Sequence, residues 1–262
     1  MPAVTLLVKV YSSSQLEDVE SNLKATLKGL KVEIKTLGTI SHGWPQISIS
    51  GEDETVAVRF LADEIGLCPT SLDNLERFST TKGYITELDK SMNELYLDIG
   101  VFSPDNLCAV IPLQRLQTQL ADGRKIALRK LSELYGLHEN LPLTVKIVTM
   151  DKESSRVEAM LSEKQLKMYA NWTKSLLDRL LVFGASLYEV QLALKNADCN
   201  RETIEIESLG TFEHAVVCKL GTDAAGLIPK IGRGLREAAL GVYNPRRIIE
   251  FFGSDFALLA SG

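Results

Sequence analysis

The chain has 262 residues, of which 45% are apolar and 24% charged, and this is the composition of an ordinary globular protein. Its net charge of −5 argues against indiscriminate nucleic-acid binding, although it leaves room for a local basic face. No apolar run approaches the roughly 20 residues that a membrane-spanning helix needs. The opening residues MPAVTLLVKVY lack a basic leader and a cleavage site, so we expect a cytoplasmic protein with no membrane partner.

The first segment of the chain has the spacing of a small α/β sandwich. Apolar periodicity predicts a strand, a helix, two strands and a helix over residues 4–11, 16–27, 32–36, 47–49 and 52–65. Gly29 and Gly66 end the two helices. This order lacks only the last strand of a ferredoxin-like sandwich, which residues 72–78 are expected to supply.

The last segment repeats that order of elements. A strand over 180–183, a helix carrying Val190 and Leu194, and two strands in ETIEIESLG and HAVVCKLG follow one another. A helical stretch interrupted by Pro229 comes next, and RRIIEFF is interpreted as the final strand. A second ferredoxin-like sandwich, produced by duplication of the first, is the hypothesis that explains the repeat.

Two histidines stand at corresponding places in the repeat, His42 in LGTISH and His214 in LGTFEH. A metal site needs several ligands, and neither histidine has a cysteine or a second histidine close by in sequence. We therefore interpret both as turn residues of equivalent hairpins, each preceded by a glycine at a strand end or bulge.

Five strands are predicted between the two sandwiches. KGYITELDKSMNELYLDIGVF gives two, NLCAVIPLQRL gives one, and LPLTVKIVTMDKESSRVEAMLSEKQ gives a hairpin. In this order they predict a small β-barrel over 80–164, interrupted by a helical insertion over 113–137. The insertion has an apolar stripe that should cap the barrel, made of Leu116, Leu120, Leu128, Leu131 and Leu134.

This central part resembles the RNA-binding OB barrel of the ribosomal protein S-one type. The matching positions are Gly83, Tyr96-Leu97-Asp98-Ile99, Val145, Ile147, Asp151, Arg156 and Leu161-Ser162. The resemblance implies an RNA-binding face that presents Tyr84, Tyr96 and Arg156, because bases stack on rings and phosphates need donors. Asn93 and Pro112 stand where that family has an aromatic residue and a histidine, so the chain departs from the family's stacking platform.

Two basic clusters offer phosphate contacts. Residues 111–130 contain five cations and one carboxylate, and residues 209–248 contain six cations and three carboxylates. The cations expected to contact RNA are Arg115, Arg124, Lys125, Arg129 and Lys130 in the first cluster, and Lys230, Arg233 and Arg236 in the second. Such contacts supply affinity without reading sequence, and nothing in the chain is specific for DNA. A solvated helix face is the alternative explanation of each cluster.

Two further resemblances extend beyond the barrel, and the first of them spans nearly the whole chain. The phrases GEDE, GLCP and CKLGTDAAGLIP resemble an archaeal family catalogued as a domain of unknown function, which implies an archaeal, cytoplasmic setting. The combination of barrel and sandwich is also similar to the alpha subunit of the archaeal translation initiation factor two. The barrel comes first in that subunit, so the order of the parts differs and no residue role is transferred.

No catalytic motif is found. The sequence lacks GxxxxGK[ST], HExxH and GxSxG, and its four cysteines are too scattered for a zinc or thioredoxin-type site. We therefore expect no catalytic residues, no metal and no cofactor, and favour a protein that is not an enzyme. We expect an RNA-binding or ribosome-associated protein of translation or RNA metabolism, with RNA or a ribonucleoprotein as its partner. The alternatives are a protein-interaction scaffold or transcription-complex subunit, with a protein partner, and an enzyme with an inter-domain site.

The expected architecture is α+β, with two ferredoxin-like sandwiches flanking a small OB-type barrel. The predicted parts are a sandwich over 1–79, the barrel over 80–164, a helical connector over 165–179 and a sandwich over 180–262. The connector has an apolar stripe that should pack against a domain, made of Leu166, Tyr169, Trp172 and Leu176.

Overall fold

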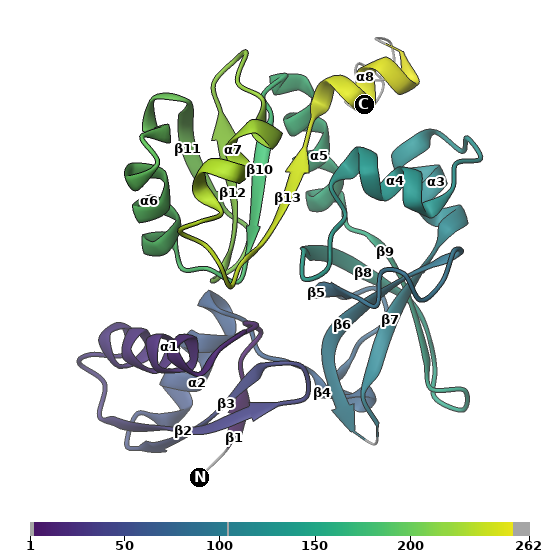
Figure 1. Ribbon diagram of the computed structural model, residues 1–262. Coiled ribbons are helices and arrows are strands. Elements are labelled where there is room, and N and C mark those ends of the chain that lie inside the picture. The colour runs from purple at the N-terminus through teal and green to yellow at the C-terminus, as the bar shows by residue number, and fades with distance from the viewer. Residues whose placement is uncertain (1–2, 104, 254–262) are drawn as a thin grey trace. The chain divides into compact units, whose positions relative to one another are not determined.

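Residues 3–103 and 105–253 are described by the computed structural model, in which the chain forms two units (Figure 1). The first unit is Met1–Leu75 with Gly100–Leu107, and the second is Glu76–Ile99 with Cys108–Gly262. Strand β6 (Glu94–Ser103) belongs to both, because the boundary falls within it. Helices and strands contribute throughout, so the predicted α+β class is confirmed.

The first unit contains a three-stranded antiparallel sheet and two helices. Its elements are β1 (Ala3–Thr5), α1 (Ser13–Thr26), β2 (Val32–Ile40), β3 (Trp44–Gly51) and α2 (Glu54–Glu64). The strand order is β1-β3-β2, and both helices lie on one face of the sheet (Figure 1). The Ser12 hydroxyl begins α1 by accepting a hydrogen bond from the Gln15 backbone N–H. The predicted order of these five elements is confirmed.

The prediction of a strand over residues 72–78 is wrong. A two-residue strand, β4 (Thr70–Ser71), comes earlier and pairs in parallel with β6 rather than with the sheet of the first unit. Leu72–Asn74 then form a 3-10 turn, η1. The Asn74 side-chain amide donates to the Pro69 carbonyl oxygen at 2.8 Å, and this local bond favours a turn over a strand.

Five strands of the central part close into a barrel. They are β5 (Thr80–Thr86), β6, β7 (Leu107–Pro112), β8 (Pro142–Asp151) and β9 (Arg156–Leu161). The order is β6-β5-β8-β9-β7, and pairing between β6 and β7 closes the ring. Inward-facing residues alternate along each strand, so that Leu95, Leu97 and Val145 are completely buried. The prediction of a five-stranded barrel is confirmed.

The insertion between β7 and β8 consists of two helices rather than one. Helix α3 (Leu113–Ala121) ends where Asp122 and Gly123 adopt left-handed backbone conformations, and α4 (Leu128–Tyr135) follows. The Tyr135 hydroxyl joins the two helices by donating to the Leu120 carbonyl oxygen at 2.6 Å. All five leucines of the predicted apolar stripe are buried, as expected of helices that cover a core.

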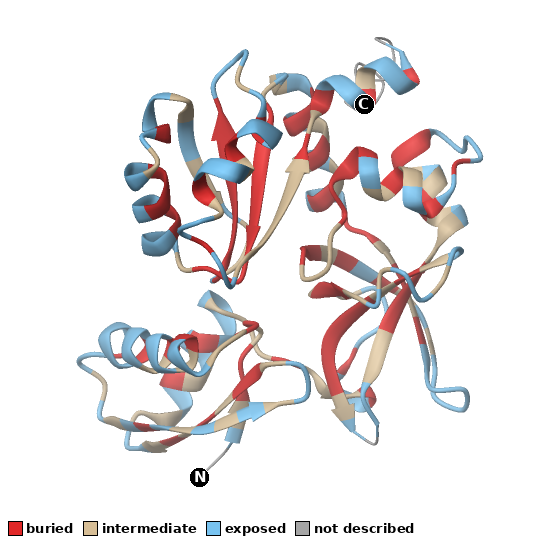
Figure 2. Ribbon diagram, in the orientation of Figure 1, coloured by how far each residue is buried: buried red, intermediate tan, exposed pale blue. Residues whose placement is uncertain are grey.

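The C-terminal part has a four-stranded antiparallel sheet. Its elements are α5 (Glu163–Ser175), β10 (Arg179–Phe183), α6 (Leu187–Asn196), η2 (Cys199–Arg201), β11 (Thr203–Ser208), β12 (Glu213–Cys218), α7 (Ala224–Ile231), β13 (Ala239–Tyr243) and α8 (Pro245–Phe252). The strand order is β11-β12-β10-β13. Strands β10 and β12 are buried along their whole length (Figure 2). One face of the sheet packs on α6 and α7, where Leu180 meets Val190 and Leu227.

The other face of this sheet is covered by α5 and by the end of the insertion. Tyr169 and Trp172 of α5 pack with Tyr243 of β13, and the Trp172 and Tyr243 rings are 5.1 Å apart. Burial raises the pKa of the Tyr169 and Tyr243 hydroxyls, so these groups stay neutral. The prediction that the connector packs through an apolar stripe is confirmed at Tyr169 and Trp172, which are buried. Leu176 has a left-handed backbone conformation and is 43% exposed, so its inclusion in the stripe was wrong.

The segment RRIIEFF is helix α8, so its prediction as a strand is wrong. The Asn244 side-chain oxygen accepts hydrogen bonds from the backbone N–H groups of Arg246 and Arg247, at 2.9 and 3.3 Å. Pro245 occupies the first helical position, where its missing N–H is no loss. The last strand is instead β13, which lies just before this cap and pairs with β10.

The repeated LGT stretches have different local structures. Gly38 lies at a bulge of β2 with φ +124°, as predicted, whereas Gly210 lies in the turn before β12. His42 is exposed in the turn between β2 and β3, but His214 lies inside β12 and is 1% exposed. The prediction of equivalent hairpin positions is therefore wrong, because β12 begins before its histidine and β3 begins after its own.

Candidate nucleic-acid interface

A group of charged side chains surrounds Tyr96 on the outside of the barrel. We call it the barrel patch, and it consists of Lys90, Glu94, Tyr96, Arg115, Arg156 and Glu158. Glu94 and Tyr96 are two residues apart on β6 and so point to the same side of the strand. The Tyr96 hydroxyl donates to Glu94 Oε2 at 2.8 Å, and Arg156 Nη2 donates to Glu94 Oε1 at 2.6 Å.

The remaining members extend the barrel patch over β9 and α3. Arg156 Nε is 3.4 Å from Glu158 Oε1, and Arg115 Nη2 is 3.8 Å from Glu158 Oε2. Lys90 Nζ lies 5.0 Å from the centre of the Tyr96 ring. The barrel patch thus holds three cations and two carboxylates, and Lys90 also pairs with Glu87, with Nζ 2.5 Å from Oε2. Its side chains are partly or fully open to water.

The ion pairs of the barrel patch are weak enough to be exchanged for ligand phosphates. Hydrogen bonds from Arg156 and Tyr96 hold the pKa of Glu94 below its usual range, so this carboxylate is charged at neutral pH. Solvent-exposed ion pairs of this kind contribute only about 0–1 kcal/mol. A phosphate can therefore replace Glu94 or Glu158 as the partner of Arg156 at little free-energy cost.

Three of the residues predicted from sequence, Tyr96, Arg115 and Arg156, come together in the barrel patch. Lys90 was missed, although its place in the polar turn beside β6 was a signal that could have suggested it. Tyr84 is completely buried, and assigning it to an RNA-facing surface was wrong. Its hydroxyl lies against the turn at Gly210, because a methyl group added to the Gly210 Cα would be 3.4 Å from the Tyr84 hydroxyl oxygen. The ring therefore packs in the interior of the second unit.

The other cations of the first basic cluster follow α3 in the sequence, on the loop to α4 and on α4 itself. We call them the insertion cations, and they are Arg124, Lys125, Arg129 and Lys130. Arg124 Nη1 donates to the Phe252 carbonyl oxygen at 3.2 Å, and Lys130 Nζ lies 5.6 Å from the Phe251 ring centre. Arg129 and Lys130 share Glu133, while Lys125 is exposed. Arg124 therefore helps to hold α8, Lys130 is half-buried beside it, and Lys125 and Arg129 face water.

The second basic cluster lies elsewhere on the C-terminal part. Lys230 Nζ is bound by both carboxylate oxygens of Glu202, at 2.8 and 3.1 Å, and Arg233 and Arg236 are exposed after the end of α7. Helix α7 covers the face of the sheet opposite to α5, because Leu180 and Leu181 of β10 point to opposite sides. The structure therefore does not bring Lys230, Arg233 or Arg236 to the insertion cations.

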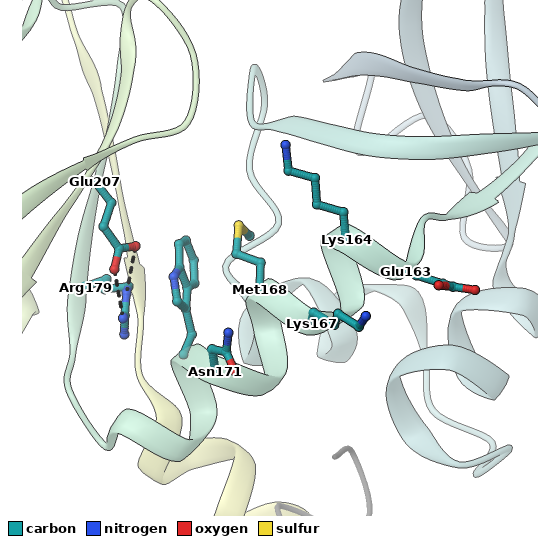
Figure 3. A pocket seen from close by; sticks show the side chains of 8 residues that line it. Glu163, Lys164, Lys167, Met168, Asn171, Arg179 and Glu207 are labelled. Carbon is teal, nitrogen blue, oxygen red and sulfur yellow. Dashed lines mark hydrogen bonds and ion pairs between the residues drawn. The ribbon is translucent and has the colours of Figure 1, made fainter. Parts of the chain in front are cut away.

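An open cleft of about 740 Å³ lies between α5 and the C-terminal sheet (Figure 3). We call it the α5 cleft, and it is lined by Glu163, Lys164, Lys167, Met168, Asn171, Trp172, Arg179 and Glu207. Arg179 Nη2 and Nε lie 3.2 and 3.4 Å from the two Glu207 oxygens, and the guanidinium stacks 4.7 Å from the Trp172 ring centre. Figure 3 shows this pair across the cleft from Lys164, with Met168 between.

Sequence reasoning did not predict the α5 cleft. Lys164, Lys167 and Asn171 recur at spacings of three and four and so share one side of α5, which was a signal that could have been noticed. Lys82 of β5 lies near Lys164, and its Nζ donates to the Leu209 carbonyl oxygen at 3.4 Å. Burial lowers the pKa of Lys82. The negative charge of Glu213 opposes this effect, and the positive charge of Lys164 adds to it.

The described part of the chain contains no group of three or more His, Cys, Asp or Glu side chains that could hold a metal ion. Its cysteines are free thiols, of which Cys108 alone is not buried. Within residues 3–103 and 105–253, no helix has the length and apolar character needed to cross a membrane.

Family models match almost the entire chain. The N-terminal, central and C-terminal domain models of DUF2110 match residues 3–71, 75–173 and 177–243. The expected resemblance to a family of unknown function that spans nearly the whole chain is thereby confirmed. No curated protein matches the chain.

One solved structure that matches is described as the crystal structure of an a/eIF2alpha-aDim2p-rRNA complex from Pyrococcus horikoshii OT3. The match is 12% identical, covers 47% of this chain and spans 64% of the length of that one, with a TM-score of 0.26. A likeness of this size carries no argument about fold or function.

Proposed function

The chain belongs to the DUF2110 family, and we propose that it is a non-enzymatic protein that binds RNA or a ribonucleoprotein in translation or RNA metabolism. The observation that carries this proposal is the barrel patch. There a partly exposed tyrosine ring lies beside three cationic side chains on one surface, from β6, α3, β9 and the turn before β6.

The chemistry of the barrel patch suits single-stranded RNA. A base can stack on the Tyr96 ring, which is worth about 1–3 kcal/mol per base and tolerates any sequence. Lys90, Arg115 and Arg156 can contact the phosphates on either side of that base, and each contact releases counterions. Glu94 and Glu158 occupy the arginines of the barrel patch, so only a ligand whose phosphates displace these carboxylates can bind there. Such competition suits a chain whose net charge of −5 disfavours indiscriminate binding of nucleic acid.

The insertion cations extend this surface. Arg115 stands near the beginning of α3 and Lys125 shortly after its end, and a helix of nine residues is about 13 Å long. One RNA segment can therefore contact the barrel patch and the insertion cations together. Lys230, Arg233 and Arg236 are retained as a separate proposed contact for a larger RNA, because they lie on the other side of the C-terminal sheet.

A charge-reversal experiment tests this surface. Lys125→Glu with Arg129→Glu changes two exposed residues and spares Arg124, which also holds Phe252. The matched control is Lys28→Glu with Arg59→Glu, an equal change at two exposed residues of the first unit, one just after α1 and one in α2. We expect the insertion variant to bind a fluorescent single-stranded RNA at least about tenfold more weakly than the control at low salt. Equal affinity of the two variants would contradict the proposed surface.

A protein-interaction scaffold or transcription-complex subunit is the second candidate, and one observation favours it. Leu187, Tyr188, Leu192 and Ile204 are 41–70% exposed beside an open groove of about 500 Å³ along the edge strand β11. Exposed apolar groups at a free sheet edge are typical of protein contacts. A partner protein that stays bound after nuclease treatment, and is lost on Leu192→Lys with Ile204→Lys, would favour this function over RNA binding.

We also propose that the two outer parts are copies of one ferredoxin-like sandwich. Strands β10-β12-β11 have the same order and directions as β1-β3-β2, and a helix follows the first and third strand in both. The domain boundaries at residues 79, 164 and 179, the OB assignment of the barrel, and an archaeal, cytoplasmic setting are likewise proposals. Expression of residues 180–262 alone tests the last boundary, because a self-contained sandwich should unfold cooperatively.

A further inference from the structure

We propose that the α5 cleft binds a nucleoside phosphate, either as a free mononucleotide or as the phosphorylated end of an RNA. None of the barrel-patch residues lines this cleft. The inference therefore goes beyond the proposed function and does not depend on RNA binding by the barrel.

The size and lining of the cleft suit a ligand of nucleotide size. Its volume of about 740 Å³ lies within the range of about 300–1,000 Å³ that small-molecule sites occupy. Apolar and polar groups both line it, with Met168 and Trp172 on the helix side and the Arg179–Glu207 pair opposite. This combination fits a ligand that has a flat ring at one end and charge at the other.

Lys164 and Lys167 form the cationic end of the cleft. They stand three residues apart on α5, and among the described residues neither makes an ion pair with a carboxylate. Lys164 also repels the charge of Lys82, although the Glu213 carboxylate offsets part of this effect on Lys82, and Glu163 also lines the cleft. A phosphate placed here would relieve that repulsion and gain charge-assisted hydrogen bonds.

The opposite end of the cleft is rigid and directs orientation. Arg179 is 4% exposed and donates to the Ser175 hydroxyl at 3.1 Å and to the Leu177 carbonyl oxygen at 3.0 Å, in addition to Glu207. Its charge is already balanced by Glu207, whose own negative charge repels a phosphate. The phosphate is therefore directed to Lys164 and Lys167, at the end of the cleft opposite to Glu207 (Figure 3).

The middle of the cleft can hold a base. Trp172 is 3% exposed and has Arg179 stacked on it, so a base does not sandwich against this ring but lies on Met168 beside it. Asn171 offers an amide that can both donate and accept, and Glu207 offers unused acceptor positions. Adenine can donate to Glu207 from its exocyclic amino group, whereas uracil has no amino group and offers only its N3–H, flanked by two carbonyl oxygens that the carboxylate repels.

The experiment measures binding of AMP, UMP, adenosine and inorganic phosphate to the full chain by calorimetry. Wild-type protein is compared with Lys164→Ala/Lys167→Ala and with Lys174→Ala, an exposed lysine of the same helix that does not line the cleft. We expect AMP to bind more tightly than the other three probes. The double variant should weaken AMP binding by about tenfold or more, and Lys174→Ala should not weaken it.

Two RNA probes distinguish the sources of the nucleotide. A short single-stranded RNA with a 5′-phosphate is compared with the same RNA carrying a 5′-hydroxyl. If the phosphorylated RNA competes with AMP and the hydroxyl form does not, the cleft accepts an RNA end; if neither competes, it accepts only the free nucleotide. Absence of AMP binding at millimolar concentration together with equal binding of the two RNAs would overturn the proposal, as would AMP binding that the double variant leaves unchanged.

Failure here is distinguishable from failure of the proposed function. Lys125→Glu/Arg129→Glu should weaken binding of long RNA and leave AMP binding intact, since neither residue lines the α5 cleft. Loss of AMP binding in the insertion variant would place the nucleotide outside the cleft and overturn the inference.

Discussion

Replacing two tyrosines of the barrel, Tyr84 and Tyr96, separates an interior role from a surface role. Tyr84 is completely buried on β5, whereas Tyr96 is partly exposed on the neighbouring strand β6. Burial of an aromatic side chain removes about 150–250 Å² from water. At about 25 cal/mol per Å² this is worth about 4–6 kcal/mol, and aromatic-to-alanine changes in cores cost about 3–5 kcal/mol. We expect Tyr84→Ala to lower the free energy of unfolding by about 4 kcal/mol.

Tyr96→Ala should act differently. It removes one partly buried hydrogen bond to Glu94 and the contacts of a partly exposed ring, so we expect a loss of stability of no more than about 1 kcal/mol. RNA binding should weaken by about fivefold or more, because a stacking partner for a base is lost. Urea denaturation followed by circular dichroism measures the first quantity, and fluorescence anisotropy with a labelled RNA measures the second.

Two outcomes of these measurements would contradict the assigned roles of Tyr84 and Tyr96. If Tyr84→Ala left the urea midpoint unchanged and reduced RNA affinity, then Tyr84 would be a surface residue and its burial would be wrong. If Tyr96→Ala left RNA affinity unchanged in a folded protein, then the barrel patch would not stack bases and the proposed interface would lose its aromatic component.

Three further changes test other parts of the structure. Arg179→Ala removes a buried cation with four hydrogen bonds and leaves Glu207 unpaired, so urea denaturation should show a loss of about 2–4 kcal/mol; a loss under about 0.5 kcal/mol would show that the pair is not formed. Burial lowers the pKa of His214 below its ordinary value of 6.5. The neutral His214 side chain therefore makes its full contribution to the free energy of unfolding above pH 6.5, and this contribution decreases at lower pH as His214 of the unfolded chain takes up a proton. The free energy of unfolding should therefore fall less steeply between pH 6.5 and 5 in His214→Gln than in the wild type, and identical slopes would contradict this. Asn244→Ala removes the cap of α8 and should cost about 1 kcal/mol, with faster amide hydrogen exchange in α8; unchanged exchange would contradict the capping role.

Local patterns were sufficient to predict most elements of this chain. The barrel strands alternate in polarity, and the leucine stripe of the insertion follows helical spacing, so each could be identified without knowledge of its neighbours. The N-cap at Ser12 and the glycines at positions 29 and 66 likewise mark helix ends by their own chemistry.

The errors occurred where one local signal outweighed another. In RRIIEFF the paired isoleucines and phenylalanines favoured a strand, but Asn244 followed by Pro245 is a helix start, and the cap decided the structure. Residues 72–78 contain enough apolar positions for a strand, yet the side-chain bond of Asn74 to Pro69 selects a turn. In both cases a polar side chain determined the backbone conformation.

The candidate sites depended on contacts between distant residues. Alternation placed Tyr84 on one side of β5 but could not show that the Gly210 turn covers that side. The partners Arg179 and Glu207 of the α5 cleft are separated by 28 residues, and no local pattern relates them. The barrel patch was found in part because its aromatic and basic members lie in the segment that resembles an RNA-binding barrel.

The salt dependence of RNA binding tests the central claim most directly. The logarithm of the binding constant should fall linearly with the logarithm of salt concentration, by about 0.7 for each phosphate of single-stranded RNA that the protein contacts. We expect the slope for Arg115→Gln/Arg156→Gln to be smaller than that of the wild type by about 1–2, because two phosphate contacts of the barrel patch are lost. A slope equal to that of the wild type, or no RNA binding by the wild type at low salt, would contradict the claim that this surface binds RNA.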